Sequence, residues 1–219
     1  MPIYRPVADH ALLVEFSTTI SDKAHAQVLA LDQALAARPF AGLRETIPAF
    51  VNLLVDFDPQ VTDHGQAEAH LRSLTLQTEG RPEPALREVL VSYHDAPDLE
   101  EVARRTGLAP EAVIAAHLSG DYQVFLYGFA PGYAYLGGVP QALRLDRKPS
   151  PVRGVPAGSV IIAGAQCLVT TLTMPTGWWI IGRSATRVLT GDEAQPFLFD
   201  VGDQVRFRRI SAADHAALT

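Results

Sequence analysis

The most informative stretch of the chain reads V-F-L-Y-G-F-A-P-G-Y-A-Y-L-G-G from Val124 to Gly138, and the same region ends in V-P-A-G-S-V-I-I-A-G from Val155 to Gly164. An apolar strand enters this region, and aromatic side chains flank Pro131-Gly132. Glycine lets a backbone turn sharply or approach another group closely. The pattern therefore predicts either a structural corner between barrel strands or the rim of a pocket.

A basic loop separates the two parts of this region. It contains Arg144, Arg147, Lys148 and Arg153, in a chain whose net charge is -6. Four cations in one loop of an acidic chain favour an anionic ligand or an acidic partner surface.

The rest of the second half reads as short strands separated by glycine or proline. β-Branched and aromatic residues dominate these segments, as in most strands. The segments are 160–163, 167–173, 178–181 and 205–210. Because no helical pattern lies between them, we predict a closed antiparallel β-barrel.

The first 75 or so residues alternate strand and helix patterns instead. A strand at 12–16 precedes a helix that begins at Ser21, and a strand at 46–58 precedes a helix built on Ala67 and Leu71. This order predicts a small α/β sandwich with its helices on one face of a sheet. The proline-rich segment 78–84 is the expected linker. The fold class is therefore α+β, with an N-terminal domain at 1–80 and a barrel domain at 81–219.

Two short helices are expected where the barrel domain begins. Asp98 is a good N-cap residue with Glu101 three positions later, Gly107 ends the first helix, and Pro110 begins the second. His117 falls near the end of the second helix. It is expected either to line a pocket or to stabilise the helix end as a cation.

Composition excludes several classes of function. The chain has no basic stripe for nucleic acid and no apolar run of membrane-spanning length. Its start lacks the pattern of a secretory signal, so a cytoplasmic location is expected. The single cysteine, Cys167, excludes an internal disulfide and a thiolate cluster, and the seven histidines lack metal-site spacing, so no metal is expected.

Arg183 is the sharpest single candidate for chemistry. Strand alternation places Trp179, Ile181 and Arg183 on one face. An arginine at a strand end can bind the carboxylate of a ligand through two parallel hydrogen bonds. An ordinary ion pair within the protein is an equally supported interpretation of Arg183. The other candidates for a ligand pocket are Tyr127, Gly128, Pro131, Gly132, Tyr133, Arg147, Arg153, Pro156, Gln166, Trp178 and His117.

Three ordered motifs carry a resemblance to a known family. They are Y-G-F-A-P-G-Y-A-Y-L-G-G at 127–138, V-P-A-G-S-V at 155–160 and G-W-W-I-I-G-R at 177–183. They resemble the family of the 5-oxoprolinase B subunit, which also includes the KipI kinase inhibitor, allophanate hydrolase subunit 1 and part of the carboxyltransferase region of urea carboxylase. The resemblance implies a cyclophilin-like barrel that follows a smaller α/β domain.

The resemblance also implies an activity. It points to the B-type subunit of an ATP-dependent 5-oxoprolinase, which opens 5-oxoproline to glutamate together with a C-type (KipA-like) subunit and an A-type subunit. Arg183 and Arg153 would then stabilise the charge that develops on the reacting lactam. The chain has no phosphate-loop motif, so ATP is expected to bind through the assembled complex. The alternatives are a KipI-like inhibitor of a sensor histidine kinase and a subunit of an allophanate hydrolase or urea carboxylase-type carboxyltransferase.

Two departures from the family pattern bear on the ligand. The chain has G-A-Q-C-L at 164–168 where the family usually shows Gly-Gly-Gln-Thr-Gly. It has M-P-T-G-W at 174–178 where the family usually shows Ser-Pro-Gly-Gly-Trp. If Ala165 and Thr176 border the pocket, the choice of ligand is expected to differ from that of the family.

Overall fold

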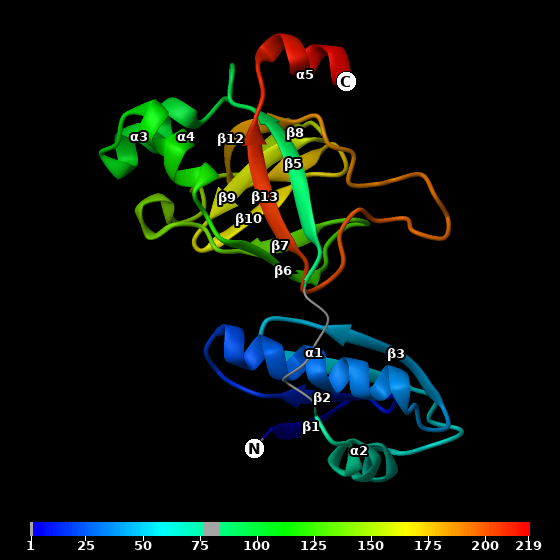
Figure 1. The fold of residues 1–219 in the computed structure, drawn as a ribbon. Coiled ribbons are helices and arrows are strands. Elements are labelled where there is room, and N and C mark those ends of the chain that lie inside the picture. Colours follow the sequence, from blue (N-terminus) through cyan, green and yellow to red (C-terminus); the bar gives the residue numbers. More distant parts are fainter. Residues whose placement is uncertain (1, 77–83) are drawn as a thin grey trace. The chain divides into compact units, whose positions relative to one another are not determined.

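The computed structural model describes residues 2–76 and 84–219 (Figure 1). By its internal contacts the chain divides into two compact units, Met1–Glu83 and Pro84–Thr219. The expected linker at 78–84, with the domain boundary after residue 80, lies outside the described residues except for Pro84.

The first unit is a four-stranded antiparallel sheet with two helices. Its strands follow the order β1-β2-β4-β3. The elements are β1 (Ile3–Val7), β2 (Ala11–Glu15), α1 (Asp22–Ala37), β3 (Leu43–Pro48), β4 (Asn52–Phe57) and α2 (His64–Ser73).

One apolar cluster holds the first unit together. Alternate residues of β2 and β4, such as Leu12 and Val55, are fully buried and pack with Val28 and Leu31 of α1 and Leu71 of α2. Side chains two apart in a strand share a face, so both helices cover the same side of the sheet. This layering is the one that the sequence predicts.

The second unit contains the remaining strands, three α-helices and a short 3₁₀ helix, η1 (Gln141–Leu143). The strands are β5 (Leu86–Ser92), β6 (Tyr122–Tyr127), β7 (Ala134–Gly137), β8 (Val152–Val155), β9 (Ser159–Ala163), β10 (Gln166–Val169), β11 (Met174–Thr176), β12 (Trp179–Ser184) and β13 (Gln204–Arg209). The helices are α3 (Leu99–Thr106), α4 (Pro110–Leu118) and α5 (Ala212–Leu218).

Seven of these strands close into a barrel in the order β10-β7-β6-β13-β5-β12-β9. Every neighbouring pair is antiparallel except β13 and β5, which run parallel along six paired residues. The predicted α+β fold with a closed barrel is confirmed, and the parallel pair is the one departure from a purely antiparallel wall. Strands β8 and β11 form a separate two-stranded sheet.

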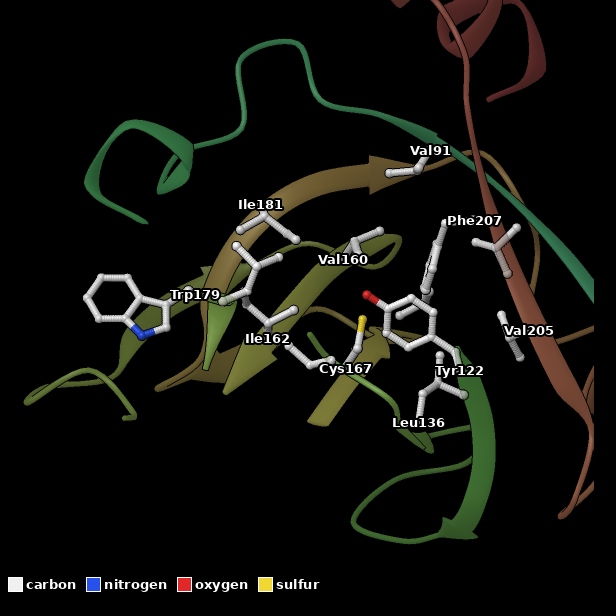
Figure 2. Close-up of a cluster of buried hydrophobic side chains, with 14 of the residues drawn as sticks. Val91, Tyr122, Leu136, Val160, Ile162, Cys167, Trp179, Ile181, Val205 and Phe207 are labelled. Carbon is white, nitrogen blue, oxygen red and sulfur yellow. The ribbon is translucent and has the colours of Figure 1, made fainter. Parts of the chain in front are cut away.

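The barrel interior is filled by side chains (Figure 2). Tyr122, Cys167 and Phe207 point toward one another from three different strands, and Val160 and Ile162 lie beside them. All five are at most 4% exposed. The barrel is therefore a packed core, and a ligand site must lie on its surface.

Asp98 does not cap α3 as the sequence predicts. Its side chain makes no cap hydrogen bond. Instead Oδ2 accepts a hydrogen bond from the backbone N–H of Ile180 at 2.6 Å and contacts the ammonium group of Lys148. The Asp98 carboxylate pairs with the buried Lys148 ammonium instead of capping the helix, because a carboxylate–ammonium contact is stronger than a hydrogen bond to a neutral backbone N–H. Gly107 ends α3 in a left-handed conformation, as expected.

Candidate functional site

A surface cleft of about 190 Å³ lies on the outside of the barrel, over β7, β9 and β10. It contains three of the predicted ligand residues, Tyr133, Arg147 and Trp178. The other lining residues are Phe129, Tyr135, Ile161, Leu168, Pro175, Thr176 and Gly177.

Strand alternation explains why the cleft forms. In β9 and β10, Ile162 and Cys167 point into the barrel core, so their neighbours Ile161 and Leu168 point outward. These outward residues form a second apolar cluster with Tyr133. The barrel wall thus provides an apolar floor, and the loops around it provide the sides of the cleft.

Aromatic rings and one cation form the sides of the cleft. The Arg147 guanidinium lies 5.7 Å from the centre of the Trp178 ring, and Tyr135 meets the same ring edge to face at 5.9 Å. Burial raises the pKa of Tyr133 to about 12, with a smaller contribution from Tyr135. Burial also raises the pKa of Tyr135, so both phenols stay protonated at neutral pH. The Tyr133 hydroxyl donates to Met174 Sδ at 2.6 Å, and Arg147 supplies a positive charge.

The residues on either side of Arg147, Asp146 and Lys148, hold this segment in place. The backbone N–H of Lys148 donates to Gly177 O at 2.7 Å, and the Trp179 indole N–H donates to Asp146 O at 2.8 Å. The Lys148 ammonium lies 5.5 Å from the centre of the Trp179 ring and pairs with Asp98. Two consecutive cations thus lie over two consecutive tryptophan rings. Only the first pair, Arg147 and Trp178, faces the cleft.

Gly128, Pro131 and Gly132 do not line the cleft, although they belong to the loop that carries Phe129. The Thr171 hydroxyl donates to Pro131 O at 2.7 Å. Gly132 has a φ of +72°, and a Cβ there would lie 2.7 Å from a Leu189 methyl group. This loop positions Phe129 and Tyr133, which do line the cleft. Gly128 shows neither a positive φ nor a close contact, so it carries no such requirement.

Several other predicted ligand residues lie apart from the cleft. The Tyr127 hydroxyl donates to Phe199 O at 2.5 Å. The carbonyl of Pro156 accepts hydrogen bonds from the Ser159 and Thr170 hydroxyls, each at 2.8 Å. Gln166 begins β10 and pairs through its backbone with neighbouring strands. These contacts are structural, so the structure does not gather these three residues around one ligand.

His117 belongs to the barrel core. It is fully buried, with Nδ1 2.6 Å from the Tyr93 hydroxyl and Nε2 3.5 Å from Cys167 Sγ. Burial lowers the pKa of His117 to about 3. The imidazole is therefore neutral at physiological pH, so it cannot act as a cation at the end of α4, and it does not reach the cleft.

Arg183 lies on a different face from the one expected. A β-bulge interrupts β12 between Ile180 and Gly182. A Cβ on Gly182 would lie 2.8 Å from Val91, a core residue, so Gly182 as well as Ile181 faces the barrel interior. Arg183 therefore points away from that interior, because a bulge shifts the alternation by one residue. It lies about 13 Å of strand away from Trp179.

Arg153 lies on a strand that pairs with a strand of the cleft. It is exposed on β8, which pairs with β11, and β11 contributes Pro175 and Thr176 to the cleft. Within residues 2–76 and 84–219, neither Arg153 nor Arg147 makes an ion pair. Both cations are thus free to meet an anion.

Sequence reasoning did not single out several residues of the cleft, most clearly Phe129 and Tyr135. The signal for Tyr135 was its spacing of two from Tyr133, which puts both on the outer face of one strand end. Of the two departures from the family pattern, Thr176 lines the cleft, whereas Ala165 lies in the turn between β9 and β10. The altered residue at Thr176 therefore bears directly on what the cleft accepts.

Among the described residues, no group of three or more His, Cys, Asp or Glu side chains is placed to hold a metal ion. In the same part of the chain, no helix combines the length and apolar character that a bilayer crossing requires.

Comparison with known proteins places the chain in a family. The family model for the carboxyltransferase domain, subdomain C and D, matches residues 2–199. This chain belongs to that family. The B subunit of 5-oxoprolinase from Bacillus subtilis (strain 168) is 35% identical over 96% of this chain and 94% of its own length. A protein of the same name from Escherichia coli O157:H7 is 32% identical over 92% and 93%.

Solved structures share the fold of this family member. The protein TTHA0988 is 37% identical, with a TM-score of 0.84; the match covers 92% of this chain and only 40% of TTHA0988. The uncharacterized protein PH0987 from Pyrococcus horikoshii is 34% identical, with a TM-score of 0.58, and the match covers 97% of this chain and 100% of PH0987. The Kluyveromyces lactis urea amidolyase, at 16% identity and a TM-score of 0.77 over 99% of this chain and 15% of its own, shows the likeness of fold alone.

Proposed function

We propose that this chain is the B-type subunit of a 5-oxoprolinase that opens 5-oxoproline to glutamate. The observation that carries this proposal is the 35% identity with a 5-oxoprolinase B subunit over nearly the full length of both chains. The urea enzymes do not compete with it as guides to the substrate, because their identity of 15–16% speaks only for the fold.

The cleft suits part of such a reaction. Its volume of about 190 Å³ is below the range of roughly 300–1,000 Å³ that is common for drug-sized ligands, so it fits a small molecule. In this proposal the Arg147 guanidinium binds the carboxylate of 5-oxoproline, and the Trp178 and Tyr135 rings pack against its apolar ring atoms; the cation–ring and ring–ring contacts of these three residues support this. Thr176 at the cleft wall would tune this fit.

The lactam amide is a poor electrophile and needs activation. In the proposed reaction, ATP transfers its γ-phosphoryl group to the lactam oxygen, water adds to the lactam carbon, and the ring C–N bond breaks to leave a free amine and an acyl phosphate. A second water hydrolyses this acyl phosphate to glutamate and phosphate. Cationic groups stabilise the charge on the reacting oxygens. Arg153 beside the cleft fits this role by position, and the roles of Arg153 and Arg183 stay predictions.

One subunit supplies only part of this site. The cleft offers a cation, phenols and a threonine hydroxyl, but among its lining residues no carboxylate or histidine could serve as a general base. We therefore infer that a C-type and an A-type companion subunit complete the site and bind ATP, and that the complex works in the cytoplasm.

Reconstitution tests the proposal. The chain is mixed with its C-type and A-type companions, and glutamate formation is measured with 5-oxoproline and ATP. Turnover is expected from the mixture and not from this chain alone. Arg147→Ala is expected to raise KM for 5-oxoproline tenfold or more, and Arg147→Lys by less, because the bidentate grip is lost but the charge remains. Full turnover by the lone chain, or none by the complete mixture, would contradict the proposal.

Arg183→Ala gives a separate measurement on the same complex. Loss of kcat would support its predicted role in charge stabilisation. Unchanged turnover would show that the guanidinium at the far end of β12 plays no part.

A further inference from the structure

Phe129 combines two unfavourable features at the lip of the cleft. Its side chain is 75% exposed, and its φ is +73°, in the left-handed region that a bulky residue rarely adopts. Glycine would fit this backbone position without strain. In the isolated chain, both the strained backbone and the exposed apolar ring of Phe129 are unfavourable. Such a residue indicates a role in binding rather than in the packing of the chain itself.

The loop holds Phe129 in this conformation through its backbone. Gly128 N–H donates to Tyr133 O at 3.2 Å, Ala130 N–H donates to Gly128 O at 2.9 Å, and Tyr133 N–H donates to Ala130 O at 3.0 Å. The ring packs on Tyr133 with a centroid distance of 5.5 Å and stays largely in solvent. Phe129 is therefore presented in a fixed position, which lowers the entropy cost of binding something to it.

Other exposed groups extend this surface. Val152, 43% exposed, pairs in register with the cleft residue Thr176, and Arg153 follows it on β8. Arg147 is a further exposed cation, placed over the Trp178 ring in the cleft wall. We call Phe129, Arg147, Val152 and Arg153 the cleft face. It joins exposed apolar side chains to two cations that make no ion pair within the described part of the chain.

We propose that the cleft face is the docking surface for the C-type companion subunit, with Phe129 as its apolar anchor; this rests on the proposed function. The matched region of TTHA0988 makes up 40% of that protein, so most of its chain is covalently attached material outside the match. The curated relatives, which match this chain nearly end to end, are named as subunits. A partner that places an apolar pocket over Phe129 and Val152 would bury these two exposed side chains and close the cleft from water, while Arg147 and Arg153 stay available to the substrate.

Two substitutions at Phe129 separate docking from folding. Phe129→Gly removes the ring and also relieves the backbone, so the melting temperature should hold or rise. Phe129→Ala removes the ring but keeps most of the strain. Both should weaken the binding of the purified C-type subunit at least tenfold in calorimetry, and Phe129→Gly should do so without loss of stability. The control is Ile20→Ala, which removes an apolar side chain of 61% exposure from the first unit.

The binding measurements distinguish the docking surface from the proposed complex. If the wild-type chain binds the C-type subunit and Phe129→Gly binds it equally well, the docking surface is wrong and the proposed complex stands. If the wild-type chain does not bind that subunit, the docking surface and the proposed complex both fail. If the wild-type chain instead self-associates through Phe129, as shown by light scattering of both variants, a second copy is the occupant and the proposal is overturned.

Discussion

At the scale of single residues, His117 makes stability depend on pH. Its folded pKa is about 3, against an ordinary value of 6.5, because burial disfavours the imidazolium. Below pH 6.5 the unfolded chain takes up a proton that the folded chain refuses. The contribution of neutral His117 to the free energy of unfolding is therefore fully present above pH 6.5. Between pH 6.5 and pH 3 this contribution falls by about 1.4 kcal/mol per pH unit.

Urea unfolding between pH 7 and pH 4 measures this effect. His117→Gln is expected to lower stability at pH 7, since it disturbs the contacts with Tyr93 and Cys167. Its curve should nevertheless be flatter than that of the wild type over this range. Parallel curves for the two proteins would show that another group controls the acid sensitivity.

A glycine pair provides a second prediction at this scale. Gly138 has a φ of +103°, and a Cβ there would lie 1.9 Å from the backbone oxygen of Asp121. Gly154 has a φ of +67° with nothing within 4 Å of its Cβ position. Gly154→Ala should cost about 1 kcal/mol of strain, whereas Gly138→Ala should cost about 3 kcal/mol or more because backbone must move. Chemical denaturation distinguishes the two, and equal losses would refute the argument.

At the scale of elements, the pair of Asp98 and Lys148 ties the Arg147 segment to β12. Their side chains are only 16% and 8% exposed. Lys148→Met leaves a buried carboxylate unpaired, and Asp98→Asn leaves a buried ammonium unpaired, so each should cost about 3 kcal/mol. The double variant should lose less than the sum of the two, because it strands neither charge.

The two tryptophans report on this segment directly. They are the only ones in the chain, and both lie under it. Emission should therefore shift to the red in Lys148→Met, and KM for 5-oxoproline should rise in the assembled enzyme while the double variant recovers part of the loss. Strictly additive losses with unchanged emission would mean that the ion pair does not position the segment.

The same elements show how far sequence reasoning reaches. Local sequence patterns predicted β9, β10, β12 and β13 and the start of α1 at Ser21, because these features depend on neighbouring residues in the chain. They placed Arg183 on the wrong face because a bulge depends on the pairing of β12 with β9. They assigned Asp98 to a cap because its true partner, Lys148, is fifty residues away in the chain.

The cleft was only half predictable for a related reason. The basic loop, the aromatic stretch and the motif at 177–183 were recognised separately, and they contributed Arg147, Tyr133 and Trp178 respectively. Their convergence with Ile161 and Leu168 depends on the closure of the barrel, which no local pattern encodes. His117 shows the reverse case, since a polar residue on a helix gave no sign that the barrel core would enclose it.

At the scale of the whole molecule, the two units have separate cores. The cluster built on Leu12 and Phe57 contains only residues of the first unit, and the clusters around Tyr122 and Trp178 contain only residues of the second. Each core is closed within its own unit, so each unit should fold without the other. The second unit contains the complete cleft.

A fragment that spans 84–219 tests this separation. Its amide spectrum is expected to overlay on the corresponding signals of the full chain, and its thermal midpoint should match one of two transitions of the intact protein. The fragment should also retain binding to the C-type subunit, because every residue of the cleft face lies within it. A fragment that folds but no longer binds would show that the first unit contributes to docking, and one that fails to fold would show that the two cores depend on each other.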